Sequence, residues 1–497
     1  MASEAASEAA TVFRHGWVYL VANIVNRSAG LLLLPLYTRV LSPTEFGVYA
    51  LIVVVSDLLA VMLMIGLNNA FTVVYFDQAE EPARRRVVST CLLALNGAML
   101  GLLALCWPAG LGVSWALFGD TGQARVVAIA LGSVALTTVF ELALAYYRVR
   151  KRSLLCLGIS VAKAVALIGL NALFLLTLEW HVEGIFLGNA VAFAALGFAL
   201  SAAILAENGL GFSGGVLRRV VVLGLPYMPQ SLLDIANNVV ARWLINVMLT
   251  TAAVGLFSFG LRLAQILFMF LTASFMQIWS VRRLEARHET EDRAQTDLVF
   301  HLFLTLLTAA ALGMALTAPE ILWLIASPDY TPVLPCMPLL VLAFVLHGAR
   351  MQPEIALMKA KRMGVLPWIS AASLAVGTAL AVVMIAAWGL LGAALANLGR
   401  ELFQIAVTEI VRRRLCPGEL ALEPLRLAGI LAPAAAVYVV GWHLFADGID
   451  PTFTAAKVGL TGLFVAAAVF GPGLGQTGRA TLFRLLGGTT RRAQSAS

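Results

Sequence analysis

The sequence predicts an all-α protein that crosses a membrane many times. Of its 497 residues, 60% are hydrophobic and 12% are charged, and the mean hydropathy is +0.89. Globular domains carry roughly 25% charged residues. Apolar stretches of about 20 residues, the length at which a helix spans a bilayer, recur along the whole chain. No stretch between them is long enough for a soluble domain, so the fold is expected to lie in the membrane.

The apolar stretches predict about fourteen transmembrane helices. They cover residues 16–38, 46–70, 87–108, 126–147, 154–178, 184–206, 220–248, 253–280, 298–320, 333–357, 364–387, 389–411, 427–446 and 455–474. We expect an N-lobe at 14–210 and a C-lobe at 211–414, each with six helices, and two further helices within 415–475. The remaining segments, 1–13 and the basic 476–497, are predicted to be cytoplasmic tails, because 1–13 is acidic and lacks the basic start of a signal peptide.

The basic residues predict the orientation. With the N-terminus in the cytoplasm, the inner loops and tails hold 25 of the 34 lysines and arginines, whereas the outer loops hold only Arg39, Arg125 and Lys457. Cytoplasmic loops of membrane proteins carry the excess of basic residues. Both termini are therefore expected in the cytoplasm, and the net charge of +7 follows from topology rather than from binding nucleic acid.

An internal repeat links the two lobes. A shift of 208 residues places Asn26 on Asp234, Gly47 on Gly255 and Tyr49 on Phe257, and a shift of 211 places 147–151 on 358–362. Each copy holds six spans, an even number, so the copies have the same orientation. Parallel repeats of this kind occur in transporters, with the substrate site between the two halves.

One predicted helix, within 224–260, carries an unusual polar face. Asp234, Asn237, Asn238 and Arg242 fall on one side of a helix at about 100° per residue. A charge near the bilayer centre costs at least about 2.5 kcal/mol, so this face is expected to line a water-filled or ligand-filled cavity. The first span presents a matching face with Asn23, Asn26 and Arg27.

Other charges fall inside predicted spans. Arg350 and Glu354 are four residues apart and can form an ion pair along one helix. Arg400 and Glu401 are adjacent and are expected to point about 100° apart. The others are Asp57, Glu141, Lys163 and Arg262. Some of these could be structural ion pairs or side chains that reach the membrane surface.

The chemistry of the predicted cavity suits an anion. Guanidinium groups bind phosphate through paired hydrogen bonds, which favours substrate binding by Arg27 and Arg242 with support from Lys163 or Arg350. The asparagines Asn23, Asn26, Asn237 and Asn238 could hydrogen-bond polar groups of the same substrate. The carboxylates of Asp57, Asp234 and Glu354 could pair with the arginines or bind a coupling H⁺ or Na⁺. Pro226 and Pro229 are expected to bend or break the seventh helix.

Several motifs carry no function here. The GxGxxG matches at 209–214 and 473–478 do not follow a strand, so they do not predict a dinucleotide site. The histidines lack metal-site spacing, and the five cysteines are scattered, so no cofactor, metal or catalytic residue is predicted.

Against this background the chain resembles a known family. The opening RHGWVYLVANIVNRSAGLLLLPLYTRVLSPTEFGVYAL resembles the first hairpin of polysaccharide flippases, and TAAVGLFSF at 251–259 resembles the turn that opens their second lobe. Three more stretches resemble parts of the same flippases: SPDYTPVLPCMPLL resembles the outer loop before the tenth helix, and EGIFLGNAVA and WGLLGAALAN resemble the sixth and twelfth helices. The family is the oligosaccharidyl-lipid branch of the MOP superfamily, the Wzx-type O-antigen and exopolysaccharide transporters.

This resemblance implies two six-helix lobes around a central cavity. It also implies a non-enzymatic flippase in the bacterial inner membrane, which moves polyprenyl-pyrophosphate-linked oligosaccharides by alternating access for O-antigen, exopolysaccharide or capsule assembly. The implied partners are the lipid bilayer and a polymerase with other polysaccharide-assembly proteins. No nucleic acid is expected as a partner. Many relatives carry Asp-Arg in the seventh helix, whereas this chain has Ala241 before Arg242. A carboxylate role at that position is therefore not transferred.

Four alternatives remain. One is a scaffold that does not transport, to which a parallel repeat with buried charges gives little support. A lipid II flippase of peptidoglycan synthesis would have the same architecture and a similarly cationic cavity. A multidrug or cation antiporter of the same superfamily should have a more acidic and aromatic cavity. A membrane-embedded glycosyltransferase or ligase needs a catalytic loop or a large outer domain, and the sequence predicts neither.

Overall fold

The computed structural model describes residues 30, 32–64, 67–225, 228–285, 292–417, 419, 422–445 and 451–470. Helices make up nearly all of these ranges, and the ranges contain no strand. The chain divides into two compact units. Unit 1 comprises Met1–Asn246 and Thr250–Gly255, and unit 2 comprises Val247–Leu249 and Leu256–Ser497. We describe each unit by itself.

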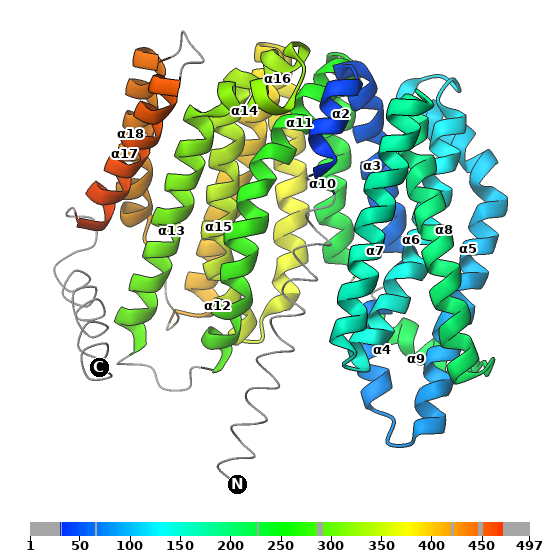
Figure 1. The fold of residues 1–497 in the computed structure, drawn as a ribbon. Coiled ribbons are helices and arrows are strands. Elements are labelled where there is room, and N and C mark those ends of the chain that lie inside the picture. Colours follow the sequence, from blue (N-terminus) through cyan, green and yellow to red (C-terminus); the bar gives the residue numbers. More distant parts are fainter. Residues whose placement is uncertain are drawn as a thin grey trace, which may run out of the picture. The chain divides into compact units, whose positions relative to one another are not determined.

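Unit 1 is a helical bundle built around α6 (Ala124–Val149), which contacts α3, α5, α7 and α8 (Figure 1). Its helices are α2 (Leu34–Val40), α3 (Pro43–Met64), α4 (Leu67–Phe76), α5 (Glu81–Phe118), α6, α7 (Ser153–Ala172), the π-helical η1 (Leu173–Thr177), α8 (His181–Asn208), α9 (Gly214–Gly224) and most of α10 (Met228–Met248). Phe71, Phe140 and Tyr146 lie fully buried in its core. The apolar side chains of α6 therefore form the centre of the core of unit 1.

Unit 2 is a second bundle, in which α13 (Asp292–Leu316) contacts α15, α17 and α18 (Figure 1). Its elements are most of α11 (Thr251–Leu267), the π-helical η3 (Phe268–Thr272), α12 (Ala273–Glu285), α13, α14 (Ala318–Ile325), η4 (Pro328–Cys336), α15 (Met337–Lys359), η5 (Met363–Val365), α16 (Leu366–Leu415), α17 (Pro424–Phe445) and α18 (Pro451–Phe470). Lys457, predicted to lie in an outer loop, instead lies in α18, where it is buried and donates to Glu320 of α14 at 2.6 Å.

Within the described ranges, ten helices are long and apolar enough to cross a membrane, which confirms the all-α membrane fold. This number is smaller than the predicted fourteen for identifiable reasons. Most of the first span lies outside the described residues, α16 contains two spans, and α10 and α18 do not meet the criterion. The count of fourteen and the cytoplasmic location of both termini stay predictions.

The described residues of the predicted seventh span, 220–248, belong to two helices, α9 and α10. Its start belongs to α9, whose Arg219 pairs with Asp77 at 2.9 Å and which packs on α4 and α5. The helix α9 ends at Gly224, and α10 begins at Met228. Pro226 lies outside the described residues, so the bend or break that Pro226 and Pro229 are expected to cause stays a prediction.

Local backbone geometry supports the internal repeat. Lys151 and Lys361 both have a positive φ, 57° and 56°, and the same pattern of turn hydrogen bonds surrounds each. Glu179 and Gly389 also match, with φ values of 53° and 56°. Both pairs are 210 positions apart, so the predicted shift of 211 in this region is wrong by one residue.

The long α16 is two helices joined by a reversal at Gly389. There φ is 56° and ψ is −130°, a conformation that side chains other than glycine rarely adopt. The two halves pack against each other, since Ser373 donates to Gln404 at 3.2 Å and Gly377 lies against the stem of Arg400. The break agrees with the predicted boundary between spans 364–387 and 389–411.

Within unit 1, two repeat-related glycines make a reciprocal close contact. A Cβ on Gly47 of α3 would collide with the carbonyl oxygen of Thr251, and a Cβ on Gly255 would collide with that of Pro43. Gly47 and Gly255 are matched by the 208-residue shift, as are Pro43 and Thr251. The first turns of α3 and α11 therefore touch backbone to backbone.

We expect Gly47→Ala and Gly255→Ala to destabilise the protein, because overpacking costs about 1–3 kcal/mol and here the obstacle is backbone. The measurement is the thermal unfolding midpoint of the purified protein in detergent. Gly97→Ala in α5 is the matched control, since its Cβ would meet nothing within 4 Å and alanine gains about 1 kcal/mol over glycine in a helix. A midpoint for Gly47→Ala at or above that of the wild type would contradict the contact.

Candidate functional site

The polar face of α10 is confirmed as one helical face. Asn238 Nδ2 donates to Asp234 O at 3.1 Å, and Arg242 Nη1 donates to Asn238 O at 3.2 Å and lies 3.4 Å from Asn238 Oδ1. Asp234 and Asn238 are partly or fully exposed along the helix, and Arg242 is partly exposed. These hydrogen bonds hold the arginine side chain along the helix. Whether the face lines a transport cavity stays a prediction.

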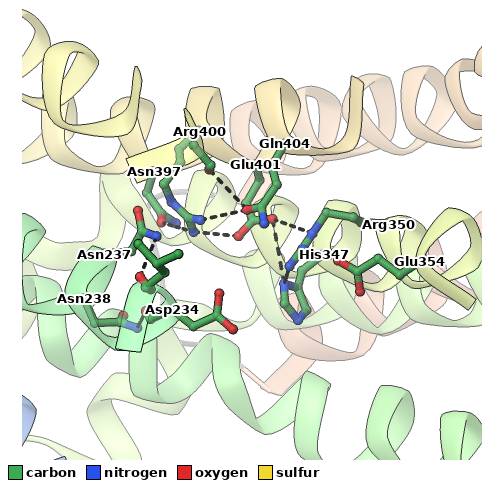
Figure 2. Close-up of polar contacts among 12 residues, drawn as sticks. Asp234, Asn237, Asn238, His347, Arg350, Glu354, Asn397, Arg400, Glu401 and Gln404 are labelled. Carbon is green, nitrogen blue, oxygen red and sulfur yellow. Dashed lines mark hydrogen bonds and ion pairs between the residues drawn. The ribbon is translucent and has the colours of Figure 1, made fainter. Parts of the chain in front are cut away.

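Asn237 lies beside this row on α10. Its Nδ2 donates to Leu233 O at 3.0 Å, one turn back, so its side chain also lies along the helix surface (Figure 2). The predicted counterpart on the first span, Asn23, Asn26 and Arg27, lies outside the described residues. Asp57 lies exposed on α3.

Lys163 of α7 is buried and has partners of its own. Its Nζ lies 3.4 Å from Glu141 Oε1 of α6 and sits over the rings of Phe140 and Phe193, 5.2 and 5.4 Å from their centroids. A carboxylate and two aromatic faces each stabilise an ammonium group. The structure therefore gives Lys163 an ion pair and a cation–π cage in the core of unit 1.

Arg350 of α15 takes part in a network of ionic and polar side chains in unit 2. It forms an ion pair with Glu354, one turn further along α15, as predicted. Its Nη2 lies 2.8 Å from His347 Nδ1, and its Nε lies 3.6 Å from Glu401 Oε2 of α16. Figure 2 shows these side chains of α15 and α16 pointing toward one another. We call these residues, with Arg400 and Gln404, the α15–α16 network.

The expectation that Arg400 and Glu401 diverge is wrong. Arg400 Nη2 lies 2.6 Å from Glu401 Oε1, and Nη1 donates to Gln404 at 3.2 Å. The long guanidinium arm bends back across the 100° that separates the two Cβ atoms. Gly377 permits this path, because a Cβ there would come within 2.8 Å of Arg400 Cδ.

His347 and Gln404 were not predicted from the sequence. His347 precedes Arg350 by three residues and Glu354 by seven, so helical spacing places all three on one face. That spacing is the sequence feature from which His347 could have been predicted as a member of the network. Gln404 and Ser373 could not be found this way, because the reversal at Gly389 brings them together.

The charges of the α15–α16 network balance. Two arginines, Arg350 and Arg400, face two carboxylates, Glu354 and Glu401, and Glu401 is almost fully buried. A buried ion pair survives only when its partners compensate for lost hydration. Among the described residues, no group of three or more His, Cys, Asp and Glu side chains could hold a metal ion.

A double-mutant cycle tests whether Lys163 is a structural partner of Glu141. We expect Lys163→Met and Glu141→Gln each to lower the free energy of unfolding, because each leaves a charge without its partner, the half-buried Glu141 in the first variant and the buried Lys163 in the second. The double variant should lose less free energy of unfolding than the two single variants together, and the difference, which is the coupling energy of the pair, should be about 0.5–3 kcal/mol. Strictly additive losses would mean that the two side chains do not act as a pair.

Comparison with known proteins gives the family. The family model described as "Polysaccharide biosynthesis protein" matches residues 12–279. No curated protein sequence matches the chain.

Solved structures of low sequence identity share the fold. "Lipid II flippase MurJ, inward closed conformation" superposes with a TM-score of 0.72 at 12% identity, covering 92% of this chain and 98% of that one. A multidrug resistance MATE family transporter of the MOP superfamily, in an inward-facing conformation, has a TM-score of 0.60 at 14% identity, covering 79% and 95%. A point mutant of the Vibrio cholerae MATE transporter VcmN has a TM-score of 0.55 at 18% identity, covering 83% and 98%. The family match covers more than half of the sequence and agrees with the resemblance in its first hairpin: this chain belongs to the polysaccharide biosynthesis protein family.

Proposed function

We propose that this protein is a flippase for polyprenyl-pyrophosphate-linked oligosaccharides. It would move these units across the bacterial inner membrane by alternating access, for assembly of O-antigen, exopolysaccharide or capsule. Support comes from the polysaccharide biosynthesis family match and from a multi-pass fold shared with a lipid II flippase and with MATE transporters.

The observation that carries the proposal is the polar face of α10. A helix of a membrane protein that exposes a carboxylate, two amides and a guanidinium along one side is unsuited to lipid contact. Arg242 donates to Asn238, and the residue is partly exposed. A guanidinium can bind a pyrophosphate through paired hydrogen bonds, and the amides of Asn237 and Asn238 can bind sugar hydroxyls.

Two of the predicted cations form ion pairs within their own units. Lys163 pairs with Glu141, and Arg350 pairs with Glu354 and Glu401. Arg242 lies on the same face of α10 as Asn238, to which it donates, and Asn237 lies beside this row. We assign the leading substrate contact to Arg242 because of these polar neighbours, together with Arg27 of the matching predicted face.

The remaining parts of the proposal follow from the repeat. The N-lobe at 14–210 and the C-lobe at 211–414 would form the two walls of the transport path, with both termini in the cytoplasm. Asp57, Asp234 and Glu354 would neutralise arginines or take up a coupling ion. Polymerase and other assembly proteins would act on the unit once it reaches the outer leaflet.

A lipid II flippase is the second candidate, and the overlap with MurJ is the observation that favours it. Lipid II shares the polyprenyl-pyrophosphate but adds a peptide to its sugar. An assay with both substrates separates the two candidates.

The test is a flipping assay in proteoliposomes with a fluorescent polyprenyl-pyrophosphate-linked oligosaccharide and with labelled lipid II. We expect transport of the oligosaccharide, and a loss of about tenfold or more in Arg27→Ala and in Arg242→Ala. A hydrogen bond to a charged group contributes about 1.5–3 kcal/mol, and 1.4 kcal/mol corresponds to about tenfold.

Arg125→Ala is the matched control, because the Arg125 side chain is 73% exposed and pairs with Glu183 within unit 1. It should transport at the wild-type rate. If correctly folded Arg27→Ala and Arg242→Ala both transport normally, the assignment of the α10 face fails. If the wild type moves only lipid II, the second candidate is correct.

A further inference from the structure

His347 of α15 has a specific environment that the proposed function does not use. Its Nδ1 lies 2.8 Å from Arg350 Nη2 and 3.7 Å from Glu401 Oε2. The ring of Phe268, from the π-helical η3, meets it edge-on at 5.0 Å, and Phe344 lies on the same helix as His347 at 6.4 Å. One imidazole nitrogen therefore faces both an arginine and a carboxylate.

The contact with Arg350 determines the protonation state of this imidazole. An arginine guanidinium has only donors and does not lose its proton in proteins. At 2.8 Å, Nδ1 of His347 must therefore accept the hydrogen bond from Arg350 Nη2. An accepting Nδ1 carries no proton, so His347 is neutral in this conformation and its proton lies on Nε2.

Glu401 offers a hydrogen-bond acceptor to a protonated His347. Glu401 Oε2 is buried and has no hydrogen-bond partner among the described residues, while its other oxygen accepts from Arg400 at 2.6 Å. Arg350 Nε is likewise buried without a hydrogen-bond partner in the described part of the chain, 3.6 Å from Glu401 Oε2. Buried polar atoms are normally paired, so each unpaired atom calls for a reason.

We propose that His347 is a proton-binding site and that protonation exchanges its partner. The neutral imidazole accepts from Arg350. The imidazolium donates Nδ1–H to Glu401 Oε2 and repels the guanidinium of Arg350, which keeps its ion pair with Glu354. The 3.7 Å separation needs to close by about 1 Å to reach the length of a charge-assisted hydrogen bond.

The surroundings of His347 connect this exchange to the fold. The charged groups of the α15–α16 network are Arg350 and Glu354 from α15 and Arg400 and Glu401 from α16, and η3 contributes the ring of Phe268. A partner exchange would therefore shift α15 against α16. It would also move His347 against Phe268 and so act on the π-helical η3. Isolated π-helical turns within α-helices are frequent at functional sites.

The link to transport rests on the proposed function. Histidine is the side chain whose ordinary titration falls between about pH 5 and 8. A pH difference across the membrane would change the protonated fraction of His347 as the site becomes accessible to either side. The proton is then the coupling ion, and His347 rather than Asp57, Asp234 or Glu354 is the group that carries it.

The direct test is ¹⁵N NMR of the full-length protein labelled at histidine and reconstituted in nanodiscs, with His347→Gln identifying the signal. We expect Nδ1 of His347 to be unprotonated at about pH 8.5 and both nitrogens to be protonated at acid pH. In Glu401→Gln, the Nδ1–H signal of the imidazolium at acid pH should move, because the carboxylate that accepts this proton is gone.

Glu423→Gln is the matched control, since the side chain of Glu423 is 53% exposed and pairs with Arg426; it should leave the Nδ1–H signal of His347 unchanged. If Glu401→Gln does not fold, Glu401→Asp replaces it and should also move this signal, because the shorter side chain places its carboxylate differently. A wild-type His347 that carries its proton on Nδ1 at about pH 8.5, or stays neutral down to about pH 5, overturns the proposal whatever the variants show.

A transport measurement tests the coupling. In proteoliposomes, a pH gradient should change the initial flipping rate of the wild type several-fold, and His347→Gln should lose this response. A variant that keeps the wild-type response overturns the coupling role. If no lipid-linked saccharide is moved at all, the proposed function fails, while the NMR titration still decides whether His347 binds a proton as described.

Discussion

Compensation of charge inside an apolar medium is the constraint on which this structure depends. An ion without a partner in a protein interior costs several kcal/mol, so its neighbours must supply the opposite charge. Lys163 pairs with Glu141 in unit 1, and Lys457 pairs with Glu320 in unit 2. Buried Arg412 binds Glu409 through both carboxylate oxygens, at 2.8 and 2.9 Å. Each of these pairs fixes a side chain that would otherwise need water.

The polar face of α10 differs from these pairs in its composition. Arg242 donates to the backbone and amide of Asn238 on the same helix and is partly exposed. A face that combines a guanidinium, a carboxylate and amides suits a polar ligand better than lipid. This composition supports our choice of Arg242 as a substrate contact, and the proposed function gives no role to most of the α15–α16 network.

Much of the fold could be predicted because it follows from local sequence. Hydropathy located the long helices, and the glycine at 389 separated two spans where the structure shows a reversal. The α10 face followed from helical spacing. The α15–α16 network could not be predicted, because it depends on how two helices pack: the absent side chain of Gly377 lets Arg400 bend back to Glu401. The offset of 210 residues between the two repeats in this region could not be predicted either. The matching backbone turns at Lys151 and Lys361 reveal it, and residue identities do not.

The central claim is that this protein moves a polyprenyl-linked oligosaccharide from the inner to the outer leaflet. The most direct measurement is mass spectrometry of the polyprenyl-linked saccharides that accumulate when the protein is depleted from its native cell, combined with a membrane-impermeant label that reports their leaflet. The account predicts a sugar unit without a peptide, attached to a polyprenyl pyrophosphate and confined to the cytoplasmic leaflet. Accumulation of lipid II alone, or no accumulated lipid-linked saccharide, would contradict it.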